Sequence, residues 1–272
     1  MPQPRIKIFT RSFDLRLYRL AKGLFCDWKD AEGNPIPCVR LTDRSADGYF
    51  YTMLRDTDCD VAINIDEDAF IVNPAAVLDL VGTLLEGGYA NIGCSERDCS
   101  VRGTDPVITN PFFNVLNLKL IRTRFDRGAL QRTIADAEPY YPFFRWLAAN
   151  FPTLYLQAEQ HSDGITTIAR DRQGRVICLH TWYARFYSMP GWIVRRIEPQ
   201  GMQKKRIDAV IREVYALRKM PVPEFGLADK LSFAANKVFR WLIKIPQRIS
   251  RWPYKLKLRL SRRKRQKGRI KP

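Results

Sequence analysis

The chain has 272 residues, 46% of them hydrophobic, and a formal net charge of +18. This composition suits one large globular domain, or one domain with an appendage, and excludes fibrous and low-complexity classes. No run of 18 apolar residues is present and the first residues, MPQPRIKIFTRSFD, contain no secretory apolar core, so we expect a cytoplasmic protein without a membrane-spanning helix.

Strand and helix patterns alternate through the first third of the chain. The expected strands are residues 6–10 (IKIFT), 38–42 (CVRLT) and 61–65 (VAINI). Helical patterns occupy residues 15–25 and 49–55 between them. A longer helix should follow, opened by Asn73 as N-cap and Pro74 in the first turn, and ended by Gly87 and Gly88.

The alternation continues in the middle of the chain. The expected elements are a strand at 89–94, a polar loop at 95–111, an apolar segment at 112–121, an aromatic helix at 139–150, strands at 153–159 and 175–183, and a helix at 206–219. Alternating strands and helices predict an α/β fold, with a parallel or mixed sheet covered by helices on both faces. Binding sites in such sheets gather beyond the carboxyl ends of the strands.

The charge is unevenly distributed, which predicts two parts. Residues 225–272 contain 16 Lys or Arg and one acid, Asp229, a net charge of +15. The other 224 residues hold 30 basic and 27 acidic groups, a net charge of +3. Beyond a linker, MPVPEFG, we therefore expect a basic appendage, residues 225–272, on a nearly neutral domain, residues 1–224.

The six cysteines are irregularly spaced and form no CxxC pair. This spacing fits neither a zinc ribbon nor a disulfide framework, so we expect reduced, partly buried thiols.

Three acids, Asp66, Glu67 and Asp68, follow the apolar strand VAINI and precede another apolar run, AFIV. Acids after a strand often cap the next helix or lie in water, but Asn73 already provides a cap. Clustered carboxylates repel unless a cation or hydrogen-bond donors balance them. In an extended segment Asp66 and Asp68 would point the same way and Glu67 elsewhere, so these two acids predict a Mg²⁺ or Mn²⁺ site.

The segment INIDEDAFI resembles the DxD segment of GT-A-fold glycosyltransferases, which use nucleotide-sugar donors. ITNPFFNVLNLKLIR (108–122), EPYYPFFRWL (138–147) and the stretch from YLQAEQHSDGITT to LHTWYARFY resemble later parts of bacterial members, in the same order. The resemblance covers about residues 5–190 and implies a single GT-A-like, Rossmann-like mixed sheet.

The resemblance also implies site residues. Asp66 and Asp68 match the two DxD acids, which contact the metal or the donor ribose, and His180 matches a late histidine that often completes the metal site. A buried histidine bonded to the backbone is the alternative for His180. Thr10 and Arg11 end the first strand, where such enzymes hold the nucleotide.

Other candidates have simpler alternatives. Asp43 follows the second strand and could contact a base or ribose, or cap a turn. Arg185 could clamp a diphosphate, since guanidinium suits paired phosphate oxygens, or lie in water. Asn114 and Asn117 could bind sugar hydroxyls or serve only local packing and turns.

An inverting transferase needs a carboxylate base beside the acceptor hydroxyl. The segment AEQHSDG offers Asp163 first and Glu159 second. Asp163-Gly164 is also an ordinary turn signal, and a retaining enzyme would need no such base.

The basic appendage has helical amphipathic order at its start. An apolar face is formed by Leu231, Ala235, Val238, Leu242, Ile245 and Ile249, and a basic face by Lys230, Lys237, Arg240, Lys244, Arg248 and Arg251. Pro246 should break the helix. The apolar face favours an anionic membrane surface for residues 226–272 over nucleic acid or a solvated terminus.

The sequence thus predicts a metal-dependent glycosyltransferase on the cytoplasmic face of the inner membrane. The favoured donor is a UDP-sugar and the acceptor a glycan or lipid-linked glycan. The alternatives are a nucleotidyl- or phosphotransferase using the same acids, and a non-enzymatic membrane or nucleic-acid binding protein.

Overall fold

The structure is a computed structural model that describes residues 3–42, 48–101, 105–130, 138–188 and 201–239, with Arg196 and Leu242. The chain divides into two compact units, Met1–Glu224 and Phe225–Pro272. In the described residues no helix is both long and apolar enough to cross a membrane.

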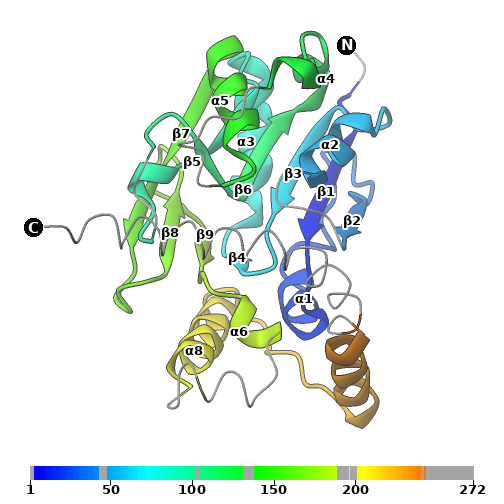
Figure 1. The fold of residues 1–272 in the computed structure, drawn as a ribbon, viewed down its shortest axis with the longest axis vertical. Helices are drawn as coiled ribbons and strands as arrows, with labels where there is room; N and C mark the ends of the chain where they lie inside the picture. The colour runs from blue at the N-terminus through cyan, green and yellow to red at the C-terminus, as the bar shows by residue number, and fades with distance from the viewer. Residues whose placement is uncertain are drawn as a thin grey trace, which may run out of the picture. The chain divides into compact units, whose positions relative to one another are not determined.

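The first unit is built on a nine-stranded mixed sheet (Figure 1). The strands are β1 (Ile6–Arg11), β2 (Cys38–Leu41), β3 (Val61–Ile65), β4 (Ala69–Ile71), β5 (Asn91–Ser95), β6 (Thr109–Asn117), β7 (Thr153–Gln160), β8 (Thr167–Arg170) and β9 (Val176–His180). Their order is β2-β1-β3-β6-β5-β7-β8-β9-β4. β1 is parallel to β2 and β3, and β5 is parallel to β7. The remaining pairs are antiparallel.

The sheet must curl, because three residues join β3 near its middle to β4 at its edge. Residues 66–68 can span little more than about 10 Å of extended chain. β4 nevertheless pairs with β9, which is five strands from β3 in the sheet order. The curl therefore brings the end of β9 beside the acids that follow β3.

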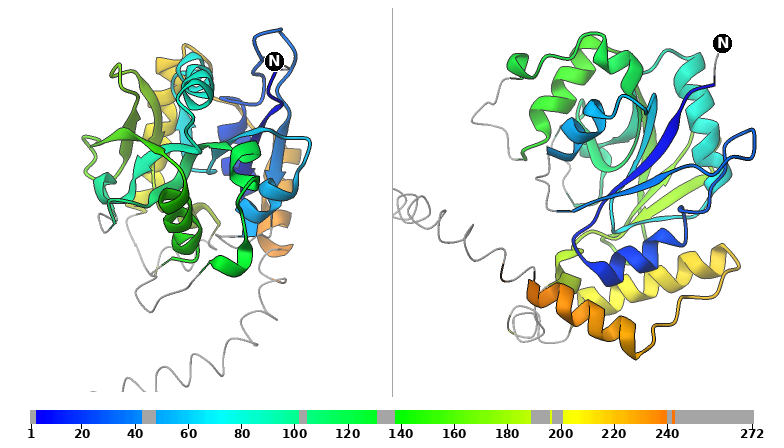
Figure 2. Two further views of the ribbon diagram at one scale, coloured as in Figure 1. Left: turned by 90° about the horizontal axis from the view of Figure 1, so that it is seen from above. Right: turned by 90° about the vertical axis from the view of Figure 1, so that its right-hand side faces the viewer.

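Helices cover both faces of the sheet (Figure 2). The helices are α1 (Leu15–Lys22), α2 (Gly48–Arg55), α3 (Pro74–Glu86), α4 (Leu118–Arg122), α5 (Tyr141–Asn150), α6 (Arg185–Ser188) and α8 (Met202–Leu217), with short 3₁₀ turns η1 (Glu96–Asp98) and η2 (Arg127–Ala129). One core cluster joins α2, α4 and α5 to Phe9, Ala62 and Leu116 of the sheet. Ile8 and Ile63 alternate with these positions along β1 and β3 and are also fully buried, so both faces are covered.

The predicted α/β class, with a mixed sheet flanked by helices, is confirmed. Strand 61–65 has the predicted bounds, and Asn73 caps α3 by accepting a hydrogen bond from Ala76 N. Two strands were not predicted: β4 lies in the run AFIV, and β8 lies between the two late strands. The segment 112–121 is a strand only to Asn117 and then turns into α4, because the Asn117 side chain caps that helix.

In the second unit, residues 227–239 are helical. The predicted break at Pro246 and the basic positions beyond residue 239 lie outside the described residues.

Candidate functional site

The acid segment is the link between β3 and β4. Asp66 N donates to Phe112 O at 2.8 Å, and Ala69 N donates to Asp66 O at 3.0 Å, which closes a turn. The expectation of an extended segment, with Asp66 and Asp68 alternating to one side, was therefore wrong. The turn still places the two carboxyl groups close enough to influence each other's ionisation.

Glu67 is bound to the connection from β1 to α1 and has a structural role. Its Oε2 accepts hydrogen bonds from Ser12 Oγ (2.9 Å), Phe13 N (2.7 Å) and Asp14 N (2.8 Å). These donors form the connection from β1 to α1. Burial raises the pKa of the Glu67 carboxyl to about 8, opposed by the hydrogen bonds from Asp14 and Ser12. Glu67 thus fixes the end of β1 against the acid segment.

Asp68 and His180 form the centre of the site. His180 Nε2 lies 3.2 Å from Asp68 Oδ1, and both side chains are almost completely buried. The pairing follows from the register of β4 and β9, in which Ala69 lies opposite His180. Burial opposes ionisation of Asp68, but His180 and the N–H of Ala184 outweigh it and hold the pKa of Asp68 below its usual value.

Asp66 lies beside this pair, where both positively and negatively charged groups act on it. Burial raises its pKa to about 6; the Arg11 guanidinium opposes the rise, the Asp68 carboxylate adds to it, and His180 opposes it. The ionisation of Asp66 therefore depends on Arg11, Asp68 and His180 as well as on burial.

The His180 ring is clamped between aromatic side chains. It stacks on Phe112, with centroids 4.4 Å apart and 12° between the planes, and Trp182 lies 4.3 Å away on a tilted plane. Its Nδ1 is buried and has no hydrogen-bond partner among the described residues. The expected alternative of a histidine bonded to the backbone is therefore not what the structure has at either ring nitrogen.

The turn after His180 is strained and wraps around Asp68. Trp182 and Tyr183 have φ values of 58° and 60°, which non-glycine residues seldom adopt. Such conformations cost about 1–3 kcal/mol each and persist only where surrounding contacts hold them. Here Thr181 N and Ala184 N both donate to Asp68, and Trp182 Nε1 donates to Thr167 Oγ1 at 2.9 Å.

The separation of Asp68 and His180 is that of a hydrogen-bonded ion pair and also that of two neighbouring ligands of a divalent cation. Octahedral ligands at about 2.1 Å from Mg²⁺ lie roughly 3 Å from their neighbours, close to the 3.2 Å between Asp68 Oδ1 and His180 Nε2. Over the described ranges, no group of three Asp, Glu, His or Cys side chains is arranged to hold a metal. The expected metal set of Asp66, Asp68 and His180 therefore stays a prediction, and within it the structure brings Asp68 and His180 into direct contact.

Arg11 and Thr10 lie at the carboxyl end of β1, as expected of nucleotide-binding candidates. The Arg11 guanidinium lies over the rings of Phe13 (4.8 Å) and Tyr49 (5.6 Å). In the described part of the chain, Arg11 Nε and Thr10 Oγ1 are buried without hydrogen-bond partners. Buried polar atoms of this kind usually have partners, so both could bind a ligand.

For the other two donor-site candidates, Arg185 and Asp43, the structure gives less information about ligand binding. Arg185 begins α6, is exposed, and lies over the rings of Tyr183 (5.1 Å) and Phe186 (5.8 Å). Asp43 lies outside the described residues.

The two asparagines proposed for sugar binding do not join the acids. Asn117 pairs with Val61 at the start of β3, about 13 Å of strand from its end, and caps α4. Asn114 is fully buried inside the sheet, where its Nδ2 donates to Thr109 Oγ1 (3.2 Å) and Asn91 Oδ1 (3.4 Å). Their positions favour the packing and capping alternatives.

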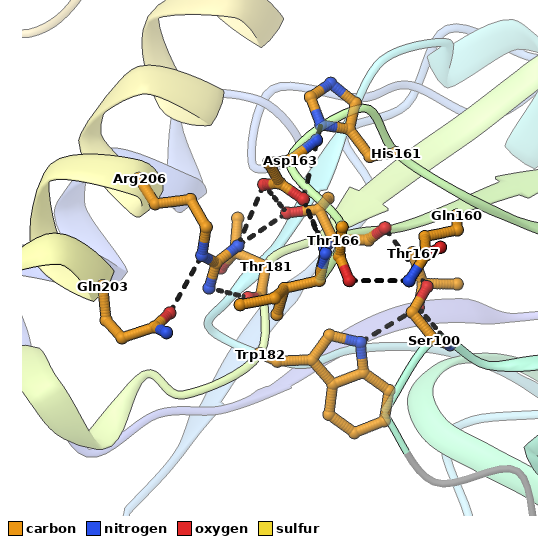
Figure 3. A network of polar contacts seen from close by, with 12 residues as sticks. Ser100, Gln160, His161, Asp163, Thr166, Thr167, Thr181, Trp182, Gln203 and Arg206 are labelled. Atoms are coloured by element: carbon orange, nitrogen blue, oxygen red, sulfur yellow. Dashed lines mark hydrogen bonds and ion pairs between the residues drawn. The ribbon is translucent and has the colours of Figure 1, made fainter.

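The two carboxylates proposed as a base are already engaged. Glu159 Oε2 accepts from Arg170 Nε at 2.9 Å on an exposed edge. Asp163 accepts four hydrogen bonds, from Ile165 N, Thr166 N, Thr166 Oγ1 and Arg206 (Figure 3). Burial opposes ionisation of Asp163, but these bonds hold its pKa far below the usual range. A carboxylate so stabilised is a poor base.

Asp163 instead supports the turn after His180. Arg206, on α8, donates to Asp163 Oδ2 (3.1 Å), to Thr166 Oγ1 (2.7 Å) and to Thr181 O (Figure 3). Arg206 was not predicted as part of the site, because one arginine on a charged helix gives no signal in the sequence. Trp182, which was part of the late segment LHTWY, and Phe112, from NPFFN, are the other side chains that complete it.

Replacing Asp163 by Asn should lower the free energy of unfolding by about 2–3 kcal/mol at pH 7, because Arg206 loses its charged partner. The folded pKa of Asp163 lies below its unfolded value near 4. Its contribution is thus complete above that value and is lost as the pH falls. Urea unfolding at several pH values should show the difference between wild type and variant shrinking below pH 4. A constant difference down to pH 2 would contradict this role.

Comparisons with known proteins do not identify the chain. No protein-family model matches it, and no curated protein matches it. Solved structures with some similarity include A197 from STIV, at 17% identity and a TM-score of 0.39, covering 64% of this chain and 93% of that one.

Two others are enzymes. A mannosyltransferase from Pyrobaculum calidifontis, in complex with GDP-Man and Mn²⁺, has 12% identity and a TM-score of 0.42, covering 90% of this chain and 76% of that one. A cytidylyltransferase from Leptospira borgpetersenii has 11% identity and a TM-score of 0.40, covering 82% and 100%. Similarities at this level assign neither a family nor an activity to this chain.

Proposed function

We propose that this chain is a metal-dependent glycosyltransferase that moves a sugar from a nucleoside-diphosphate-sugar to a glycan or lipid-linked acceptor. The observation that carries the proposal is the buried Asp68–His180 pair, with 3.2 Å between Oδ1 and Nε2. Asp66 lies beside it, as does Arg11, whose buried Nε has no hydrogen-bond partner among the residues that the structure describes. This combination offers ligands for a hard divalent cation and a donor for phosphate oxygens.

The residues would divide the work as follows. Asp68 and His180 would hold Mn²⁺ or Mg²⁺, leaving its other positions to water and diphosphate oxygens. Such an ion, when bound, stabilises the negative charge of a departing nucleoside diphosphate. Arg11 would contact the phosphates and Thr10 the nucleotide, and Asp66 would balance the charge between Arg11 and the cation. Neither Asp163 nor Glu159 is proposed as a base.

The test is to identify the product. The full chain with Mn²⁺ is incubated with a panel of UDP- and GDP-sugars and with glycan acceptors, and the nucleotide product is separated by chromatography. Release of a nucleoside diphosphate that needs both Mn²⁺ and an acceptor supports the proposal. In a parallel incubation with nucleoside triphosphates and sugar phosphates, release of pyrophosphate would instead establish the nucleotidyltransferase alternative.

We also propose that the second unit holds the enzyme on an anionic membrane surface. Apolar side chains of the described helix are largely exposed, among them Leu227 (76%), Leu231 (63%) and Val238 (59%). Leu231 and Val238 belong to the predicted apolar face. Sixteen basic residues in the same unit provide attraction to anionic lipids, of about 1 kcal/mol for each one near the surface.

Removing residues 226–272 should abolish co-sedimentation with vesicles that contain phosphatidylserine, and thermal melting should show that the remaining domain still folds. A matched variant, Leu231→Ser with Val238→Ser, keeps the net charge and should weaken binding several-fold by removing apolar burial. Unchanged vesicle binding after truncation would refute the role. Tighter binding of the wild type to duplex DNA than to vesicles, lost on the same truncation, would favour nucleic acid.

A further inference from the structure

Two cysteines lie against each other at the edge of the sheet, away from the acid segment. Cys26 follows α1 and Cys38 begins the edge strand β2. Their Sγ atoms are 2.9 Å apart, while the sulfurs of a disulfide are about 2 Å apart. A movement of about 1 Å would thus bring them to bonding distance.

The backbone between the two cysteines holds them in this position. Residues 27–37 form a hairpin-like loop, in which Ile36 N donates to Trp28 O at 2.8 Å and Asp30 N donates to Asn34 O at 2.9 Å. At its end, Cys38 is fixed by parallel pairing with Ile8 of β1. The short separation between the sulfurs is therefore set by paired backbone on both sides.

These two thiols also differ from the other cysteines in access and in charge. Cys26 and Cys38 are partly exposed, whereas Cys59, Cys94, Cys99 and Cys178 are buried. The hydrogen bond between the two thiols, aided by Lys22, lowers the pKa of Cys26, while the pKa of Cys38 is raised. Burial raises the pKa of the Cys59, Cys94 and Cys178 thiols.

We propose that Cys26 and Cys38 form a thiol–disulfide exchange site whose co-substrate is a small-molecule disulfide of the glutathione type. Cys26 attacks as thiolate and expels one thiolate, which leaves a mixed disulfide on Cys26. Cys38 then loses its proton, attacks the Cys26 sulfur and expels the second thiolate. Overall, the two protein thiols give up two electrons and two protons, and the small disulfide is reduced to two thiols.

The site lies at one end of a series of contacts that reaches the acid segment. Tyr18 contributes to the lowered pKa of Cys26, and its ring lies under the Arg40 guanidinium, 4.4 Å from ring centre to charge. Arg40 donates to Ser12 Oγ at 3.3 Å, and Ser12 in turn donates to Glu67. Oxidation therefore acts on a strand that supports the proposed donor site, although the exchange chemistry itself is independent of the proposed function.

The test uses the full native chain and oxidised glutathione, followed by alkylation and a non-reducing tryptic digest. The free thiol count should fall from six to four. Cleavage after Lys22, Lys29 and Arg40 should yield GLFCDWK joined to DAEGNPIPCVR, lighter than the sum of the two by two hydrogens. Dithiothreitol should separate them. Cross-links spread over other cysteines, or formed only in denaturant, would overturn the proposal.

Single substitutions separate the two roles. Cys38→Ser should stop the reaction at a stable glutathione adduct on Cys26. Cys26→Ser should react at least about tenfold more slowly, since the remaining thiol has the raised pKa. Cys59→Ser, which alters a buried thiol, should leave the cross-link unchanged. Rapid formation of a Cys38 adduct in Cys26→Ser would contradict the assigned order.

Discussion

Replacing Asp68 by Asn should remove measurable Mn²⁺ binding and lower nucleotide-sugar turnover by more than about 100-fold. Changing a residue that only supports a metal ligand already lowers metal affinity or activity by about 10–100-fold. Asp68 is proposed as a ligand itself, so its replacement should have a larger effect. Asparagine retains the shape and can still accept the hydrogen bond from Ala184 N. It loses the charge that pairs with His180 and would attract the cation.

Mn²⁺ titration by electron paramagnetic resonance checks the metal, and nucleoside diphosphate release checks the turnover. Asp58→Asn is the matched control, because the Asp58 side chain is 82% exposed and forms an ion pair with Arg5 just before β3 begins, at the end of that strand opposite the acid segment. It should bind Mn²⁺ as wild type does. If Asp68→Asn is folded by thermal melting and binds Mn²⁺ with unchanged affinity, the metal site is not at this pair.

Replacing Glu67 by Ala should lower the free energy of unfolding by about 3–5 kcal/mol. The three groups that now donate hydrogen bonds to its Oε2 would be buried without an acceptor. Each unpaired buried group lowers the free energy of unfolding by about 1–3 kcal/mol, and by less where water can enter. Glu67→Gln keeps one carbonyl oxygen of the same reach and should cost about 1 kcal/mol.

Urea unfolding followed by circular dichroism measures both variants. Glu86→Ala, at the exposed end of α3, should stay within about 0.5 kcal/mol of wild type. If Glu67→Ala were as stable as this control, the contact between the acid segment and the β1–α1 connection would have no role in stability.

Candidate site residues were easier to predict from the sequence than the contacts between them. Asp68 and His180 were predicted together as metal ligands from a resemblance, but the contact that joins them comes from the β4–β9 register. That register depends on a three-residue strand too short to give a pattern of its own. The wrong expectation of an extended Asp66–Asp68 segment has the same origin, since the turn exists only because the chain must enter β4.

The asparagine and base candidates stay untested as site residues, and the structure gives each of them another role. Asn114 and Asn117 lie in one apolar run. Because β6 is antiparallel to β3, Asn117 pairs with the start of β3, far from the acids. Asn114 is fully buried within the sheet. Asp163 occupies an ordinary Asp-Gly turn, in which backbone N–H groups donate to its Oδ1 while Thr166 Oγ1 and Arg206 donate to its Oδ2. Arg206 and Ser12, which complete the support of the site, are typical surface or turn residues in the sequence and become informative only through tertiary contacts.

The curl of the sheet also has a consequence for when the site forms. Asp68 is joined to Thr181 across a sequence separation of 113 residues, and β4 meets the rest of the sheet only through β9. Contacts so distant in the chain close late, because the loop between them must first be ordered. On a translating ribosome, β1 to β7 can pair before β9 has emerged. Metal affinity should therefore appear only in chains that extend past residue 188, so that a bound ion would report a completed fold.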